Sequence, residues 1–148
     1  MQLTGSHILN ATPDEVWPLM MDTDSLARMV PGITTLEHLG NHQFKAMLGV
    51  KLGPVNASFA GQLQLLNIDE PGSFSLKVQQ NSKVGNAAAT IDIKLTPVDH
   101  KQTEVQFDGD VKLSGMLATM GQRLIGSVAN TLSKQFFLNL EKELSDKQ

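Results

Sequence analysis

Residues 115–144 read GMLATMGQRLIGSVANTLSKQFFLNLEKEL, and apolar side chains recur in them three or four residues apart. This spacing places the apolar side chains on one face of a helix and the charged ones on the opposite side. The apolar stripe consists of Leu117, Gly121, Leu124, Val128, Leu132, Phe136 and Leu140, widened by Met120, Ile125 and Phe137. At about 1.5 Å per residue, such a helix is about 45 Å long. We therefore predict one long C-terminal helix that crosses an entire sheet.

The sheet is predicted from the stretch before this helix, where the hydrophobic pattern from about residue 33 to residue 113 has a period of two. Apolar and polar side chains alternate in 44–52, 58–65, 74–79, 87–95 and 103–113, and turn residues separate these segments. Strands of this kind form an antiparallel sheet with one buried face and one solvated face.

The N-terminal residues predict a strand over 2–10 and two short helices after it. Thr12-Pro13-Asp14-Glu15 has the form of a capping box with proline at the first helical position, so a helix begins here. Asp22 or Thr23 caps a second helix, which ends before Pro31-Gly32 because proline disfavours the helical conformation in the residue before it. The order predicts an α+β fold in which the long helix fills the hollow of a curved sheet, since nothing else in the chain can cover it.

Composition limits the classes of function. The chain has 148 residues, which suits a single domain 1–148, and its 41% hydrophobic content is enough for a core. Its 12 Lys and Arg are scattered and outnumbered by 15 Asp and Glu, which argues against binding to nucleic acid or anionic lipid. Cysteine is absent, which excludes disulfides and thiol chemistry. The sequence shows no targeting segment and no apolar run long enough to span a membrane, so we expect a cytoplasmic protein.

Candidate catalytic groups are few, because the strand positions predicted to face inward carry no Asp, Glu, Lys or Arg. His7 is the only titratable residue in phase with them, and two interpretations stay open: contact with the head group of a ligand, or a bond from the edge of the core to a carbonyl or a water. Glu37-His38 and His42 have the spacing of a metal pair, but Gly40-Asn41 favours a hairpin turn and no third ligand is near. We expect no metal, no cofactor and no catalytic residue.

Small residues recur on the inward face of the predicted sheet. They are Gly5, Ala46, Gly61, Ala87, Ala89 and Gly109, with Gly121 on the facing helix. Such residues either let the helix lie close to the sheet, in a solid core, or leave a gap. We favour the gap, because a long helix cannot follow a curved sheet along its whole length, and an apolar cavity then opens under one end. The predicted ligand-binding residues are His7, Phe44, Leu48, Phe59, Gly61, Leu63, Leu76, Ala89, Ile91, Val105, Phe107, Leu117, Met120, Gly121 and Leu124.

Several short motifs, in order along nearly the whole chain, match a known family. They are Val16-Trp17 with Asp22, Pro31-Gly32, Leu52-Gly53-Pro54-Val55, Phe59-x-Gly61, Gly85, Gln102-Thr103 and Phe136-Phe137. The most specific is Val111-x-x-x-Gly115-x-Leu117-Ala118-x-x-Gly121-x-Arg123-Leu124-Ile125. With these motifs the chain resembles the carbon monoxide dehydrogenase CoxG family, within the START-like (SRPBCC) superfamily.

The resemblance implies a helix-grip fold with a hydrophobic cavity between the sheet and the C-terminal helix. It also implies an accessory protein of a molybdenum hydroxylase, such as carbon monoxide dehydrogenase, that brings the enzyme to the membrane or carries a lipophilic electron acceptor such as a quinone. The family has no catalytic residues to carry over. Many members extend beyond the long helix with a membrane-associating tail, whereas this sequence stops at Gln148. We therefore expect membrane contact to be peripheral at most, at the inner face.

Three interpretations of function follow from these residues. The preferred one is a non-catalytic carrier of an apolar ligand such as a quinone or lipid. The second is a small enzyme of the polyketide cyclase or aromatase kind, which would place acids, Tyr or several His on the inward face. The third is a docking subunit without a ligand, whose weakly charged outer strand of Asn56, Ser58, Gln62 and Gln64 meets a partner; an ordinary solvated strand explains the same residues.

Overall fold

The computed structural model describes residues 2–52, 55–83, 85–119 and 122–147. The strands and helices follow the predicted order up to the end of the sheet, and residues 33–40, for which no separate strand was predicted, form one more strand. In chain order they are β1 (Gln2–Leu9), α1 (Pro13–Met21), α2 (Thr23–Met29), β2 (Ile33–Gly40), β3 (Gln43–Leu52), β4 (Val55–Asp69), β5 (Ser73–Ser82), β6 (Gly85–Asp99), β7 (Gln102–Leu113), α3 (Met116–Thr119) and α4 (Gln122–Lys147).

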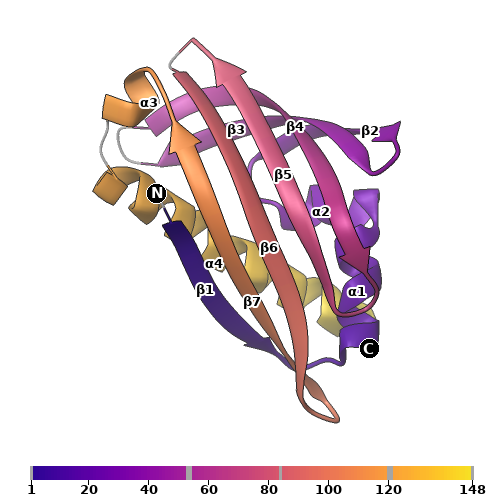
Figure 1. Ribbon diagram of the computed structural model, residues 1–148. Coiled ribbons are helices and arrows are strands. Elements are labelled where there is room, and N and C mark those ends of the chain that lie inside the picture. The colour runs from indigo at the N-terminus through magenta and orange to yellow at the C-terminus, as the bar shows by residue number, and fades with distance from the viewer. Residues whose placement is uncertain (1, 53–54, 84, 120–121, 148) are drawn as a thin grey trace.

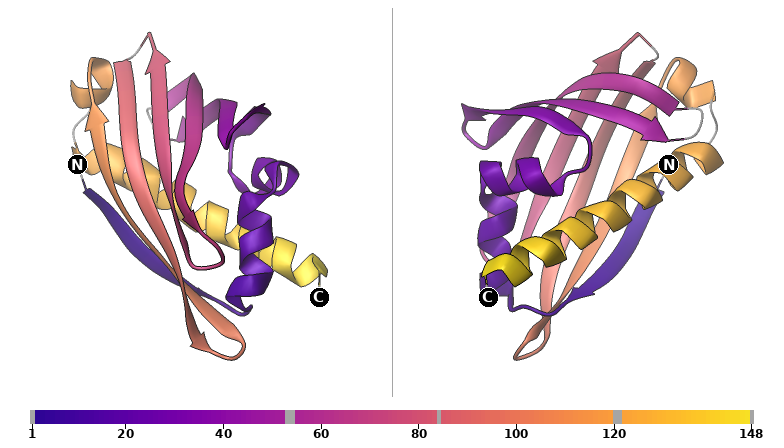
Figure 2. Two further views of the ribbon diagram at one scale, coloured as in Figure 1. Left: turned by 45° about the vertical axis from the view of Figure 1, so that its right-hand side comes forward. Right: turned by 180° about the vertical axis from the view of Figure 1, so that it is seen from behind.

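The strands form one curved sheet in the order β1-β7-β6-β5-β4-β3-β2, and every neighbouring pair is antiparallel. The strands from β2 to β7 are therefore linked as successive hairpins, while β1 joins the far edge beside β7. The helix α4 crosses the concave face diagonally, and α1 and α2 lie near its C-terminal end (Figure 1 and Figure 2). This arrangement confirms the predicted α+β fold, with an antiparallel sheet wrapped around a C-terminal helix.

The first two helices begin and end where their capping residues predict. The Thr12 hydroxyl accepts a hydrogen bond from the Glu15 backbone N–H at 3.3 Å, and the Glu15 carboxylate accepts one from the Thr12 N–H at 3.1 Å. Asp22 caps α2 by accepting from the Ser25 N–H at 3.2 Å. Val30, before Pro31, is extended, which ends α2. The chain thus reverses twice within a short span and places the apolar faces of α1 and α2 against the sheet.

The helix predicted over 115–144 corresponds to two helices of the structure, and residues 120–121 between them lie outside the described residues. The structure has a four-residue α3 and a separate α4 of 26 residues, about 39 Å long at about 1.5 Å per residue. The Thr119 hydroxyl donates to the Met116 carbonyl at 2.7 Å, a bond back along the helix that hydroxyl side chains commonly make. Helical spacing alone does not separate one helix from two segments that share an apolar side.

Two apolar clusters fill the space between the sheet and the helices. The larger lies where α1, α2 and the C-terminal half of α4 meet the sheet, and it contains Leu9, Ala11, Val16, Trp17, Leu19, Met20, Met29, Phe44, Leu65, Phe74, Leu95, Val105, Phe137, Leu140 and Leu144. The smaller consists of Phe59 and Leu117, with Leu48, Ala87, Leu113 and Val128 packed against them. The core is therefore thick at one end of α4 and thin toward the other.

The helices were also compared with the length and hydropathy that a membrane span requires. Among the helices of the described ranges, none is long and apolar enough to cross a membrane.

Candidate functional site

An apolar cavity of about 300 Å³ lies between the sheet and α4. Its walls come from the strands β2 to β7, from α1, α2 and α4, and from the loop after α2. The lining residues are Met20, Leu26, Val30, Pro31, Leu36, Phe44, Leu48, Leu63, Leu65, Phe74, Leu76, Ile91, Ile93, Val105, Phe107, Leu132, Ser133, Phe136 and Phe137. In this set Ser133 alone has a polar side chain. The cavity lies beside the middle of α4, between the two apolar clusters.

Strand periodicity positions the sheet side of the cavity. On β5 and β6 the alternate residues Leu76 and Ile91 face the cavity, and they pair directly across the two strands. On β4, the alternate residues Leu63 and Leu65 also face the cavity. The helical wall comes from one stripe of α4, which includes Leu132 and Phe136, four residues apart. Sheet and helix therefore present continuous apolar surfaces to each other across the cavity.

The chemistry available in this cavity is limited to apolar contact and a single hydroxyl. Among the described residues, none that lines it has an ionisable side chain, so its walls offer no general acid or base. Over the same part of the chain, no three His, Cys, Asp or Glu side chains come close enough together to hold a metal ion. His38 stacks on Phe44 with ring centres 4.8 Å apart, and the hairpin turn expected at Gly40-Asn41 joins β2 to β3.

The structure brings part of the predicted ligand-binding set together. Residues of that set on the cavity wall are Phe44, Leu48, Leu63, Leu76, Ile91, Val105 and Phe107. Phe59 and Leu117 lie instead in the smaller cluster. Gly61, Ala89 and Leu124 do not line the cavity. Met120 and Gly121 fall outside the described residues.

His7 lies at the edge of the core, away from the cavity wall. Its Nε2 is 2.5 Å from Oε1 of Glu141 on α4, and its ring stacks on Phe137 with centres 4.7 Å apart. Since a carboxylate accepts, the imidazole nitrogen donates this bond. The partner is thus a carboxylate, which was not considered from the sequence, and the contact of His7 with a ligand head group stays a prediction. The contact with Glu141 joins the edge strand β1 to α4, next to a ring that lines the cavity.

Two of the small residues on the inward face make room for larger neighbours. A Cβ added at Gly5 would stand 2.5 Å from Cζ of Phe107, and one added at Gly109 would stand 2.8 Å from Cγ1 of Ile91. Both Phe107 and Ile91 line the cavity. Here glycine lets a large side chain lie flat on the sheet, so the gap that we expected opposite these small residues is filled. The cavity lies next to large side chains.

The helical wall comes from other residues than the helical ones predicted for the site, such as Leu124. Met20, Leu26 and the residues Val30-Pro31 complete the cavity, and their patterns show only that each helix has an apolar side. Leu65, Phe74 and Ile93 have the inward strand phase and could have been included on that ground. Gln80 on β5 is also in the inward phase and is only 8% exposed. It lies beyond the segment where we recognised alternation.

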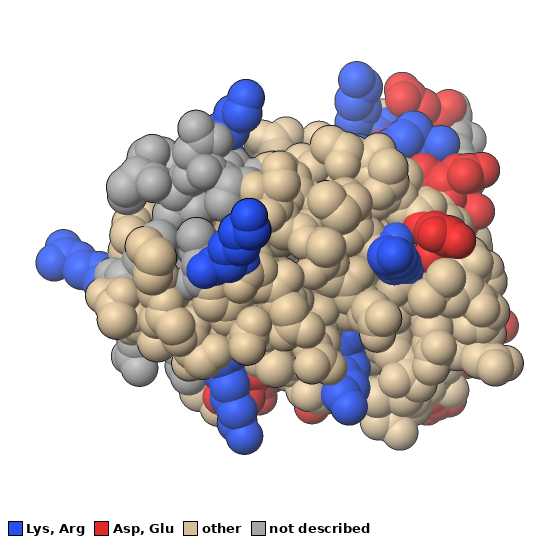
Figure 3. Space-filling model, turned by 90° about the horizontal axis from the view of Figure 1, so that it is seen from above, with Lys and Arg blue, Asp and Glu red and all other residues tan. Residues whose placement is uncertain are grey.

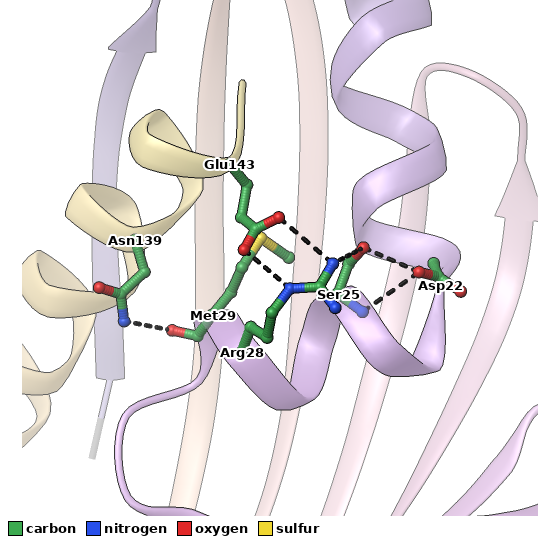
Figure 4. Close-up of polar contacts among 6 residues, drawn as sticks. All are labelled: Asp22, Ser25, Arg28, Met29, Asn139 and Glu143. Atoms are coloured by element: carbon green, nitrogen blue, oxygen red, sulfur yellow. Dashed lines mark hydrogen bonds and ion pairs between the residues drawn. The ribbon is translucent and has the colours of Figure 1, made fainter. Parts of the chain in front are cut away.

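Polar contacts hold α2, which contributes Leu26 to the wall, against α4 (Figure 4). Arg28 donates from Nε to one oxygen of Glu143 at 2.9 Å and from Nη2 to the other at 3.3 Å. This hydrogen bond raises the pKa of Arg28 above its ordinary value. Asn139 donates to the Met29 carbonyl at 2.9 Å, at the end of α2. The part of the cavity wall formed by α2 is therefore fixed to α4, which also lines the cavity.

The fold and the sequence were compared with known proteins. A conserved protein from Geobacillus kaustophilus superposes with a TM-score of 0.95 at 29% identity, covering 99% of this chain and 96% of that one. A START superfamily protein from Mycobacterium smegmatis gives 0.78 at 11% identity, covering 99% of each chain. Ara h 8.0201 gives 0.71 at 13% identity, covering 99% of this chain and 98% of its own. These structures show the START/Bet v 1-like fold.

Family membership rests on the sequence. No curated protein matches the chain in the search of such proteins. The profile of the carbon monoxide dehydrogenase CoxG family matches residues 5–145, almost the full length. The chain therefore belongs to the carbon monoxide dehydrogenase CoxG family.

Proposed function

We propose that this protein is a non-catalytic accessory protein that holds a lipophilic molecule, such as a quinone or a lipid, in the cavity between its sheet and α4. The observation that carries the proposal is the composition of the cavity wall, where Ser133 is the single polar residue among the described residues that line it. Ligand sites are concave and mostly apolar, with a few polar groups that orient the ligand. The volume of about 300 Å³ is at the lower end for such sites. It suits a ring system or part of an acyl chain better than a whole lipid.

The family supports a partner for this carrier. It takes its name from carbon monoxide dehydrogenase, so we propose a molybdenum hydroxylase complex as the partner. A carrier bound to such an enzyme would present or accept a lipophilic molecule without performing chemistry on it. A polyketide cyclase or aromatase would need acid or base groups where the ligand lies, and the cavity wall has none among the described residues.

The surface charge supports a protein that works in the cytoplasm with peripheral membrane contact at most. Seen from above, the Lys and Arg side chains are spread over the face, with broad uncharged surface between them (Figure 3). Attraction to anionic lipid depends on clustered basic residues, each contributing about 1 kcal/mol. We therefore propose that a ligand is exchanged through partner contact or brief membrane encounter.

The proposal is tested by native mass spectrometry of the purified protein, followed by organic extraction and by titration with a quinone and a fatty acyl probe. We expect a bound apolar molecule or uptake of at least one probe. Leu76→Trp should reduce uptake strongly, because the indole fills space that Leu76 borders. Lys77→Trp, at the exposed neighbouring position, should bind like the wild type. A wild-type protein that carries nothing and takes up neither probe would favour the docking subunit without a ligand.

A further inference from the structure

Gln80 places a buried polar group on the apolar inner face of the sheet. The residue is 8% exposed and belongs to the central strand β5. Within the described part of the chain, its Nε2 is buried and has no hydrogen-bond partner. Buried amide groups in folded proteins nearly always have a partner, because an unpartnered donor has lost its water without replacement. This amide is therefore a donor for which the described residues supply no acceptor.

The surroundings of Gln80 leave its side chain room on both sides. Its direct cross-strand neighbours are Gly61 on β4 and Ala87 on β6. Gly61 in turn pairs with Ala46 on β3. Gln80 thus has a long side chain, whereas its neighbours across the strands are glycine and alanine. None of these neighbours offers a side-chain acceptor.

Gln80 also lies within reach of the cavity. The residue directly opposite it on β4 is Gly61, so Leu63, two positions along, is its diagonal neighbour on the same face. Diagonal neighbours are about 7–8 Å apart, within reach of long side chains. Leu63 lines the cavity, and so does Leu48, which also packs in the smaller cluster. The amide therefore lies one row beyond the wall, on the side of the smaller cluster.

We propose that Gln80 determines ligand specificity by donating a hydrogen bond from Nε2 to a carbonyl oxygen of the bound molecule. This inference rests on the proposed carrier function and narrows it to a class of ligand: an apolar molecule that carries a carbonyl oxygen at the end held near β5. The apolar part lies among the cavity residues, and the carbonyl supplies the acceptor that Gln80 lacks. A hydrocarbon of the same shape leaves the donor unpartnered and binds less well.

The test compares two ligands of matched shape, 2-acetylnaphthalene and 2-isopropylnaphthalene, of which the first carries a carbonyl oxygen. Each is titrated calorimetrically into the wild type, into Gln80→Met, which keeps the side-chain length without the amide, and into Gln79→Met, at the exposed neighbouring position. For Gln80→Met we expect about 5- to 100-fold weaker binding of the acetyl compound, the range for a lost buried hydrogen bond. The isopropyl compound should bind unchanged or more tightly. Gln79→Met should bind both like the wild type.

A second measurement needs no ligand. Because Gln80→Met removes a buried unpartnered donor, we expect the ligand-free variant to melt at a higher temperature than the wild type, with no rise for Gln79→Met. Gln80→Leu serves as a second variant if Gln80→Met does not fold. A lower melting temperature for both, or equal losses of affinity for the two ligands, would overturn the role of Gln80 while leaving the carrier function intact. Failure of the wild type to bind either compound would count against both.

Discussion

The two halves of α4 differ in how they are held. In the C-terminal half, Phe137, Leu140 and Leu144 are buried in the larger cluster. In the N-terminal half, Leu124, Val128 and Leu132 are only half-buried. A straight helix and a curved sheet meet closely over a limited length, so one half is packed more closely than the other. The cavity, bordered by Leu132 and Phe136, lies where close packing gives way.

Polar contacts reinforce the same asymmetry. His7 bonds to Glu141, Arg28 to Glu143 and Asn139 to the Met29 carbonyl, and all three partners on α4 belong to its C-terminal half. The helix is thus anchored to β1 and α2 from one end. The C-terminal half of α4 therefore stabilises the protein, while residues nearer the middle of the helix border the space for a ligand.

The largest effect on the free energy of unfolding is expected for a substitution in the C-terminal half of α4. Leu140 is fully buried, so Leu140→Ala should lower the free energy of unfolding by about 2–5 kcal/mol. Leu138→Ala, on the same helix but 57% exposed, should change it by less than about 0.5 kcal/mol. Urea unfolding of both variants measures the difference. Similar small losses for the two would mean that the C-terminal half is not the anchor.

A smaller effect is expected where the sheet faces the less packed half. Ala89 pairs with Val78 and Val111 and does not line the cavity, so Ala89→Phe should cost about 1–3 kcal/mol through overpacking and leave ligand uptake unchanged. Ala88→Phe, exposed on the opposite face, is the control. Thermal melts should show a fall of several degrees. If stability held while uptake fell, the ligand space would extend to Ala89, as the pattern of small residues first indicated.

The smallest expected effect is on the polar contact between β1 and α4. His7→Ala removes the bond to Glu141 and the stack on Phe137, and we expect a loss of about 1 kcal/mol, because both side chains of the pair are more than a third exposed. His7→Phe, which keeps an aromatic ring, should lose less. Ser6→Ala, at an exposed neighbouring position, should not change the stability. A strong loss of ligand affinity in His7→Ala with unchanged stability would restore the head-group contact considered from the sequence.

Much of the fold could be predicted because local chemistry decides it. The alternation through Leu76 and Ile91 determined the inner face, and Thr12 and Glu15 determined the start of α1. The strand β2 was not predicted as a strand of its own, because its apolar residues Ile33, Leu36 and Leu39 lie three apart and do not alternate with polar ones.

Of the residues predicted for the candidate site, those that line the cavity all lie on its sheet side. Strand phase shows which residues share a face, so Leu63 and Phe107 were found. The orientation of a short helix depends on tertiary packing, so Met20 and Leu26 were not. Gly5 and Gly109 were interpreted as evidence of a gap between the sheet and the helix. In the fold, Phe107 occupies the space beside Gly5 and Ile91 the space beside Gly109. The position of Gln80 in the alternation of β5 indicates that its side chain faces inward. A polar residue near the end of a strand is easily interpreted as solvated, so Gln80 was not included.

The pairing of β1 with β7 has a consequence for how the chain assembles. Each other strand pairs with the strand next to it in the sequence, so those hairpins close short loops. Gln2 instead pairs with Asp110, and Leu9 with Thr103, across nearly the whole sheet-forming sequence. Closing that long loop carries the larger entropic cost, and such non-local contacts slow folding. On the ribosome, β1 therefore emerges first and waits for its partner, while β2 to β6 find theirs as they are made.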